Sequence, residues 1–323
     1  MYRYVINRIL LVFPTLIGAA ILVFGLMRLI PGDICMIRLG GGGQSIDQRA
    51  VDLCHIEVGM NRPIWRQFVD FIWGFFHFDF GTSMWSGKPV ATEILTRLPI
   101  SIEIALMATV VAVAIAIPLG MVSALRQNSW IDLVVRTVAI AGIATPSFWL
   151  GIMVILGLLT ISQAVAGSPW MPPIDYVPLW KDPLRNLSMA IWPALTVGYR
   201  SSAITMRMTR SAMLEVMRED YIRTARAKGL LTRIVINRHA LKNALLPVVT
   251  LIGIEFAFLI GGLVVTEQVF NLNGIGRLFV LSVQNQDYTM TQALVMLVVA
   301  VSIFANLIVD LAYSWLDPRI RFA

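Results

Sequence analysis

Charged residues are scarce in this chain. They make up 14% of its 323 residues, whereas hydrophobic residues make up 57%. A soluble domain carries roughly 25% charged residues, so this chain has too few charges to cover a surface in water. The mean hydropathy of +0.75 agrees with that reading. These shortages exclude a disordered chain and an ordinary cytosolic enzyme, and with only two cysteines a disulfide-rich miniprotein is excluded as well.

Residues that perform catalysis or bind metals are also few. The three histidines, His55, His77 and His239, are scattered, so neither a metal-ligand cluster nor a Ser/His/Asp arrangement can be argued. The nearest imitation of a phosphate-binding loop, residues 81–89, has one residue too many between its glycines and Pro89 where Ser or Thr should bind magnesium. We therefore predict no catalytic residue, metal site or cofactor in this chain.

Long runs without charge are present instead. About 20 apolar residues cross the hydrocarbon core of a bilayer as one helix. Five runs qualify as strong candidates: 9–27, 104–125, one span within 137–174, 244–267 with Glu255 inside it, and 288–309. A sixth, roughly 187–208, is weaker because Arg200 interrupts it. We include it because the charged loops cannot be oriented without it.

The net charge of +7 is distributed unevenly over the loops. Nine of the 26 basic residues lie in 207–242, whereas 32–98 holds six basic and seven acidic residues. Basic loops stay in the cytoplasm. Six spans then place both termini and 207–242 inside and 32–98 outside. We expect the first span to be retained, because its apolar run exceeds the roughly 7–15 residues of a signal peptide.

The external segment 32–98 is predicted to be a small folded element at the membrane surface, because aromatic residues are dense in it and prefer that interface. Both cysteines, Cys35 and Cys54, fall within it. In an oxidising compartment they could form a disulfide across 18 intervening residues. Two unpaired thiols are the alternative.

The basic loop contains the pattern of a short helix. Residues 219–229 start with two acids and end with bases and Gly229, as the helix macrodipole and a stop signal require. Tyr221, Ile222 and Ala225 can share one face, and a slim helix of this kind can sit in the groove of a partner. A second basic stretch, about 232–246, leads into the next span. Binding of anionic lipid headgroups explains the same residues equally well.

Two ionisable residues, Glu255 and Arg200, lie well inside expected spans and are possible pathway residues. Such groups are costly in lipid and usually face the bundle interior or a pathway. Glu255 is either a pathway contact for a cationic group of a solute, a structural partner of Arg200, or a protonated carboxyl bonded to a neighbouring helix. Glu103 and Asp310 lie near span ends and are expected to reach the interface.

The loop also carries a family resemblance. The run D-Y-I-R-T-A-R-A-K-G at 220–229, with Pro247 eighteen residues beyond Gly229, resembles the EAA loop of binding-protein-dependent ABC transporter permeases. The variant is that of the dipeptide/oligopeptide/nickel group of type I importers, in its first-permease type. Arg223 and Thr224 replace the Glu and first Ala of the general motif, whereas Ala225 and Gly229 match. Further matches run along the chain, at 8–18, 30–33, 79–83, 97–99, 210–216 and 317–321.

The resemblance implies an all-α fold with six transmembrane helices in the bacterial inner membrane. Its parts would be the N-terminus with the first helix (1–31), a periplasmic subdomain (32–98), a permease core (99–316) containing the coupling loop 207–246, and a cytoplasmic tail (317–323). The chain would be a pathway subunit and not an enzyme. Its substrates would be peptides or similar small polar solutes.

The resemblance also implies partners: a second similar permease, two cytoplasmic ATPases that bind ATP and magnesium, and a periplasmic binding protein, but no nucleic acid. The EAA loop would be a coupling helix that docks on an ATPase. By position, the docking residues would be Tyr221, Ile222, Thr224, Ala225, Arg226, Ala227, Lys228 and Gly229. An ion-coupled carrier or channel that uses Glu255 and Asp310 is the alternative function.

Overall fold

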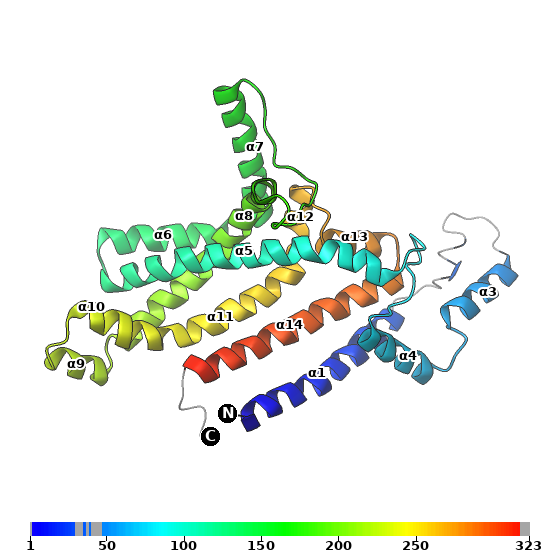
Figure 1. The fold of residues 1–323 in the computed structure, drawn as a ribbon, viewed down its shortest axis with the longest axis horizontal. Coiled ribbons are helices and arrows are strands. Elements are labelled where there is room, and N and C mark those ends of the chain that lie inside the picture. Colours follow the sequence, from blue (N-terminus) through cyan, green and yellow to red (C-terminus); the bar gives the residue numbers. More distant parts are fainter. Residues whose placement is uncertain (1, 30–34, 37–38, 40–46, 317–323) are drawn as a thin grey trace.

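Long helices lying side by side form the body of the molecule (Figure 1). This computed structural model describes residues 2–29, 35–36, 39 and 47–316, and the motifs at 30–33 and 317–321 lie outside that range. Its longest helices are α1 (Tyr2–Leu29), α5 (Val90–Leu125), α8 (Pro183–Val216), α11 (Leu241–Gly262) and α14 (Tyr288–Leu316). Over the described residues β structure is limited to one isolated bridge, between Thr82 and Pro89. The all-α prediction is confirmed.

Five helical segments are long and apolar enough to cross a membrane, and each overlaps an expected span. They are Ile6–Leu29, Val90–Leu125, Ser147–Ala166, Thr232–Gly262 and Tyr288–Leu311. The sixth expected span corresponds to α8, which has 34 residues but is more polar. Its polar side chains, including Ser201, Thr205 and Thr209, are buried. Hydropathy alone understates α8, because these groups face protein and not lipid.

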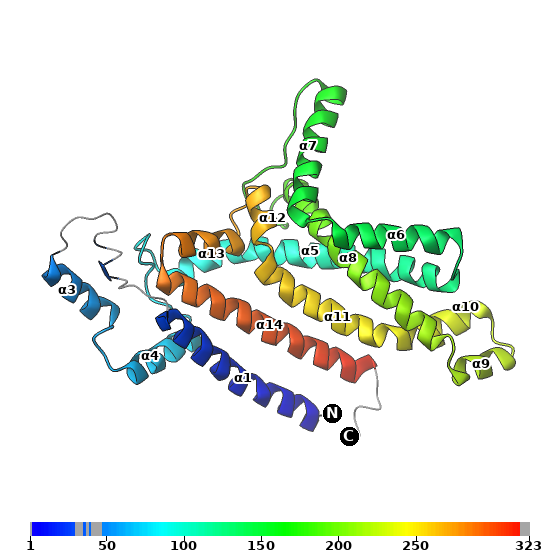
Figure 2. The ribbon, with the colours of Figure 1, turned by 180° about the vertical axis from the view of Figure 1, so that it is seen from behind.

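The third expected span is two helices instead of one. α6 (Trp130–Ala144) ends at Thr145, and α7 (Ser147–Ala166) begins after Pro146. Pro146 has no N–H to continue a helix, and Thr145 is extended, as residues before proline prefer. α6 packs on α8 and α5, whereas α7 leaves the bundle at a steep angle in both views (Figures 1 and 2).

The segment after α1 folds at the far end of the bundle from the N-terminus, as α3 (Gln48–Val58) and α4 (Ile64–His77). A disulfide joins Cys35 and Cys54, whose Cα atoms are 5.8 Å apart. α4 packs Phe68 and Phe71 against α1 and leaves Trp65 and Trp73 exposed. A small folded element with exposed aromatic rings was expected here.

The loop after α8 returns to the bundle as one continuous helix. α9 (Asp220–Ala227) is followed by α10 (Thr232–Ile234), a π-helical turn η1 (Val235–Ala240), and α11, without a break between the last three. Pro247 lies inside α11 and does not end it. After α11 come α12 (Val264–Val269) and α13 (Ile275–Gln284) at the opposite end.

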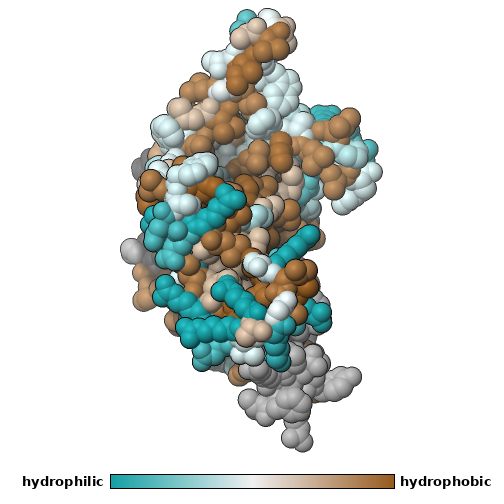
Figure 3. Space-filling view, turned by 90° about the vertical axis from the view of Figure 1, so that its left-hand side faces the viewer, coloured by the Kyte–Doolittle hydropathy of each residue, from teal (hydrophilic) through white to brown (hydrophobic). Residues whose placement is uncertain are grey.

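One end of the bundle collects the basic loops. The start of α1, the end of α14, the turn between α5 and α6, and α9 all lie at this end (Figure 1). Seen from this end, hydrophilic side chains gather around apolar ones (Figure 3). The structure therefore groups these loops as the charge pattern required.

Candidate functional site

The short helix α9 is held to the rest of the chain by one apolar face. Ile222 and Ala225 are buried, at 0% and 7% exposure. They pack in a cluster with Ala124 of α5, Ala212 and Met213 of α8, and residues of η1 and α11. The sequence placed Ile222 and Ala225 among the docking residues. The structure turns these two side chains toward the chain's own core. Docking through α9 stays a prediction.

The opposite face of α9 is open. Six of the expected docking residues are exposed: Tyr221, Thr224, Arg226, Ala227, Lys228 and Gly229. The Tyr221 hydroxyl accepts a hydrogen bond from Asn243 Nδ2 at 2.7 Å, which fixes α9 to α11. Gly229 ends the segment with a φ of +75°, a left-handed conformation that glycine adopts without strain.

A hollow beside α9 extends this open face. It measures about 500 Å³ and lies where α8 ends and α9 starts. Its lining is mostly charged: Ser211, Leu214, Glu215, Arg218, Glu219 and Asp220. The end of the bundle therefore presents a basic helix with a mixed-charge recess next to it.

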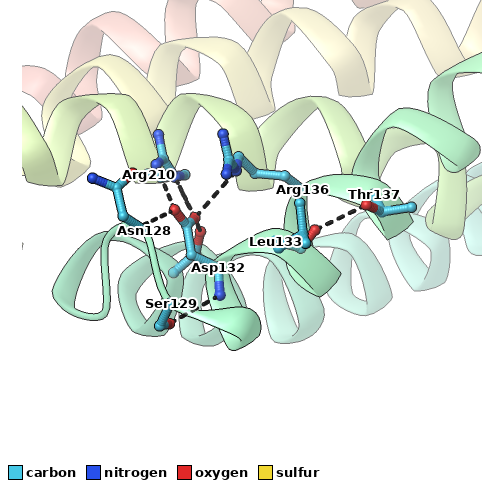
Figure 4. Close-up of polar contacts among 8 residues, drawn as sticks. Asn128, Ser129, Asp132, Leu133, Arg136, Thr137 and Arg210 are labelled. Atoms are coloured by element: carbon cyan, nitrogen blue, oxygen red, sulfur yellow. Dashed lines mark hydrogen bonds and ion pairs between the residues drawn. The ribbon is translucent and has the colours of Figure 1, made fainter.

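Behind α9, a buried carboxylate joins three helices (Figure 4). Asp132 in the first turn of α6 is fully buried. Arg210 of α8 donates to both of its oxygens, from Nε to Oδ1 at 2.8 Å and from Nη2 to Oδ2 at 2.9 Å. Ser123 of α5 donates to Oδ1 at 2.5 Å and the Asn128 N–H to Oδ2 at 3.0 Å. Arg136 lies farther from Oδ1, at 3.6 Å, and is half exposed.

Sequence reasoning did not single out this cluster. One member gave a signal in the sequence: Arg210 lies in the stretch 210–216, which resembles the family but was given no role. Asp132 gave no signal of its own, because an acid shortly after a basic turn is a common helix start.

The expected pathway residues lie on α8 and α11. Glu255 is half-buried and accepts a hydrogen bond from the buried Ser201 hydroxyl, Oγ to Oε2, at 3.2 Å. Arg200 is the neighbour of Ser201 on α8 and is also half-buried. Among the described residues no hydrogen bond or ion pair joins Arg200 to Glu255. The Ser201 bond joins Glu255 to the neighbouring helix α8, and a pathway role for Glu255 stays a prediction.

A second buried carboxylate lies at the other end of the bundle. Glu267 of α12, 1% exposed, accepts from Ser101 Oγ at 2.6 Å and from the Arg277 N–H at 2.8 Å. Ser101 in turn accepts from the Ile275 N–H at 2.9 Å. Burial raises the pKa of Glu267, and the hydrogen bonds from Ser101 and Arg277 oppose that rise. This network ties α5 to α12 and the start of α13.

The two ionisable groups expected near span ends are both paired. The Tyr176 hydroxyl donates to Glu103 Oε2 at 3.0 Å, and burial together with this carboxylate raises the pKa of Tyr176 to about 12. Asp310 of α14 pairs with Arg8 of α1 at 3.0 Å. Across the described part of the chain, no three His, Cys, Asp or Glu side chains gather as metal ligands would.

Comparison with known proteins decides the family. Residues 116–322 match the family "Binding-protein-dependent transport system inner membrane component", and residues 1–105 match the N-terminal region described for such membrane components. The chain belongs to this family. Its fold and its long helices are those of an inner membrane permease, and it is the permease subunit of an ABC importer. Membership in this family does not favour an ion-coupled carrier or channel.

Relatives resemble the permease over its whole length. The dipeptide transport system permease protein DppB of Escherichia coli (strain K12) is 39% identical over 342 residues, covering 99% of each chain. The glutathione transport system permease protein GsiC of Escherichia coli O1:K1 / APEC is 36% identical over 322 residues, covering 100% of each chain. Both are permease subunits of transport systems, and neither is named as an enzyme.

Proposed function

We propose that this permease and a second, similar permease form the pathway of an importer for small peptides. The substrate class is supported by the relatives, whose names give dipeptides and glutathione as their solutes. A periplasmic binding protein delivers the peptide, and two cytoplasmic ATPases supply the free energy from bound ATP and magnesium. Both termini then lie in the cytoplasm, at the end of the bundle that carries the basic loop.

The construction of α9 is the observation that carries this proposal. One face is sealed into a core shared with α5, α8 and η1, and the other is open. The chain enters α9 from α8 and leaves it toward α11, so a displacement of α9 reaches two long helices. A stretch that only held lipid headgroups would need the basic face but not this apolar anchorage. The geometry therefore favours docking of a moving partner over lipid binding.

Alternating access follows from this arrangement. Closure of the two ATPases on ATP pushes each coupling helix, and the anchored α9 passes the push to the bundle. The pathway then changes from facing inward to facing outward, where it receives peptide from the binding protein. When ATP is hydrolysed the two ATPases separate, and the bundle returns to the inward-facing state.

The test is purification from the native membrane followed by reconstitution. An affinity-tagged permease should bring with it a second permease and ATPase subunits in fixed proportion. In vesicles the complex, with its binding protein, should accumulate labelled dipeptide only when ATP is supplied. Dipeptide uptake that continues without ATP, or purification with no ATPase, would contradict the proposal.

A further inference from the structure

The Asp132 cluster lies directly against the core that anchors α9. On α5 the cluster residue Ser123 is followed by the core residue Ala124, and on α8 Arg210 precedes the core residues Ala212 and Met213. Each of the two helices therefore contributes neighbouring residues to the polar cluster and to the anchor of α9. A movement of α9 therefore acts on the apolar core and on the neighbouring polar cluster at the same time.

The cluster is built to resist relative movement of the three helices. An arginine that donates two parallel hydrogen bonds to one carboxylate fixes both distance and orientation. Asp132 is fully buried and the Arg210 side chain is 19% exposed, so water has little access to the carboxylate oxygens of these bonds. One turn away the backbones of α5 and α8 nearly touch, since a Cβ on Gly120 would lie 2.8 Å from the Met206 carbonyl oxygen. Sliding or separation of α5, α6 and α8 at this end would break all these contacts.

We propose that the Asp132–Arg210 pair is a positioning element for coupling: it makes the ends of α5, α6 and α8 one rigid unit against which α9 pushes. The proposal rests on the docking role of α9 given above. Without the pair, α8 can move with α9 while α5 and α6 keep their positions. Hydrolysis would then proceed without a full movement of the pathway. Asp132 and Arg210 thus act through α9 and do not touch the transported solute.

Transport per ATP measures this role in the reconstituted complex. Asp132→Asn keeps the shape of the side chain and removes its charge, so we expect ATP hydrolysis to persist and peptide transported per ATP to fall about threefold or more, the range for changes within a coupled network. Asp310→Asn is the matched control. It breaks another Arg–Asp pair, between α1 and α14, and should leave the ratio unchanged.

A double variant tests whether the pair acts as a unit. Arg210→Gln should lower the ratio as Asp132→Asn does, and combining the two should lower it no further, because the shared interaction is already lost. Additive losses would overturn the assignment of a joint role.

A distance measurement in the otherwise unaltered chain avoids dependence on how well these variants fold. Spin labels on Gln127→Cys, in the turn before α6, and on Arg223→Cys, a residue of α9 outside the docking set, report whether the two elements move together; both positions are exposed. The distance distribution should be the same without nucleotide and with trapped ATP, in a complex shown to transport. With Asp132→Asn added, it should broaden or shift on trapping.

The outcomes separate this inference from the function on which it rests. A complex without bound ATPases or ATP-driven uptake contradicts the proposed function. A working complex in which the Gln127–Arg223 distance changes with ATP overturns the positioning role alone. So does Asp132→Asn with a normal ratio of transport to hydrolysis.

Discussion

At the scale of single residues, Glu255 is the strongest candidate for contact with the solute. It lies within α11, half-buried, and among the residues that the structure describes the Ser201 hydroxyl is the one group bonded to its carboxylate. A free peptide carries an ammonium group, which can donate a hydrogen bond to such a carboxylate. We expect Glu255→Gln to reduce uptake of a free dipeptide about tenfold, the worth of a hydrogen bond to a charged group.

The Glu255 prediction has two controls, one that changes the solute and one that changes a neighbouring residue. An N-acetylated dipeptide has no ammonium group, so the unaltered permease and Glu255→Gln should transport it at the same rate. Ser201→Ala removes the hydroxyl and keeps the carboxylate, and should leave discrimination between the two peptides intact. Equal uptake of the free dipeptide by Glu255→Gln would leave Glu255 a structural residue.

Gly274 tests the buried network around Glu267. A Cβ at Gly274 would lie 2.2 Å from Glu267 Oε1, and the backbone φ is −95°, so space and not conformation demands glycine. Gly274→Ala should lower stability by about 1–3 kcal/mol, as overpacking does. The measurement is the melting temperature in detergent. Gly157→Ala is the matched control, since a Cβ there meets nothing within 4 Å, and its melting temperature should not fall.

The pH dependence of stability should report Glu267. Burial raises its pKa in the folded permease, so the folded state keeps the proton to a higher pH than the unfolded chain. The stability this proton confers is present below the ordinary carboxyl pKa and is lost as pH rises through the raised one. The melting temperature should therefore decline as pH rises above the ordinary carboxyl range and through the raised pKa of Glu267. In Glu267→Gln that decline should be shallower; an equally steep decline would assign it to other groups.

At the scale of elements, the end of α9 separates docking from lipid binding. Gly229→Ala and Gly229→Trp impose the same strain at a φ of +75°, and a Cβ at this position meets no other atom within 4 Å. Only the Trp side chain adds bulk to the open face. We expect Gly229→Ala to retain most transport and Gly229→Trp to lose it about tenfold, a change of about 1.4 kcal/mol, while hydrolysis continues.

The outcome for Gly229 is decided by comparing these two variants. If Gly229→Trp transports as well as Gly229→Ala, nothing docks at this end of α9. Lipid binding would then be supported if transport depends on anionic lipid and Gly229→Trp changes that dependence. Both proteins should insert in equal amounts, because neither substitution touches the long helices.

Local sequence signals predicted the elements better than their contacts. The acids, bases and glycine of 219–229 were sufficient to place α9, because helix ends depend on neighbouring residues. They could not show that Ile222 and Ala225 face inward, since the covering residues come from α5 and α8, about 100 and 10 positions away in the sequence. The same limit explains Asp132, whose partner Arg210 is 78 residues distant. Pro146 is a local signal for the break between α6 and α7, because proline has no N–H to continue a helix.

At the scale of the whole molecule, the distribution of charge predicted which loops share one side of the membrane, and the structure has those loops at one end of the bundle. Hydropathy alone finds five spans, and the sixth was recovered because the basic loops had to share one side. In the structure the turn between α5 and α6 and the helix α9 lie at one end of the bundle, and the start of α5 lies at the other. The basic loops predict that the end with α9 faces the cytoplasm.

Labelling from one side of the membrane settles that orientation. Both native cysteines are joined in a disulfide, so an introduced cysteine should dominate labelling by a thiol reagent. Lys88 and Gln127 are both exposed, and they flank the two ends of the long helix α5. A membrane-impermeant maleimide added to intact spheroplasts should label Lys88→Cys and spare Gln127→Cys, and both should react once the membrane is opened. Labelling of Gln127→Cys from outside would invert the permease and remove α9 from the reach of any cytoplasmic ATPase.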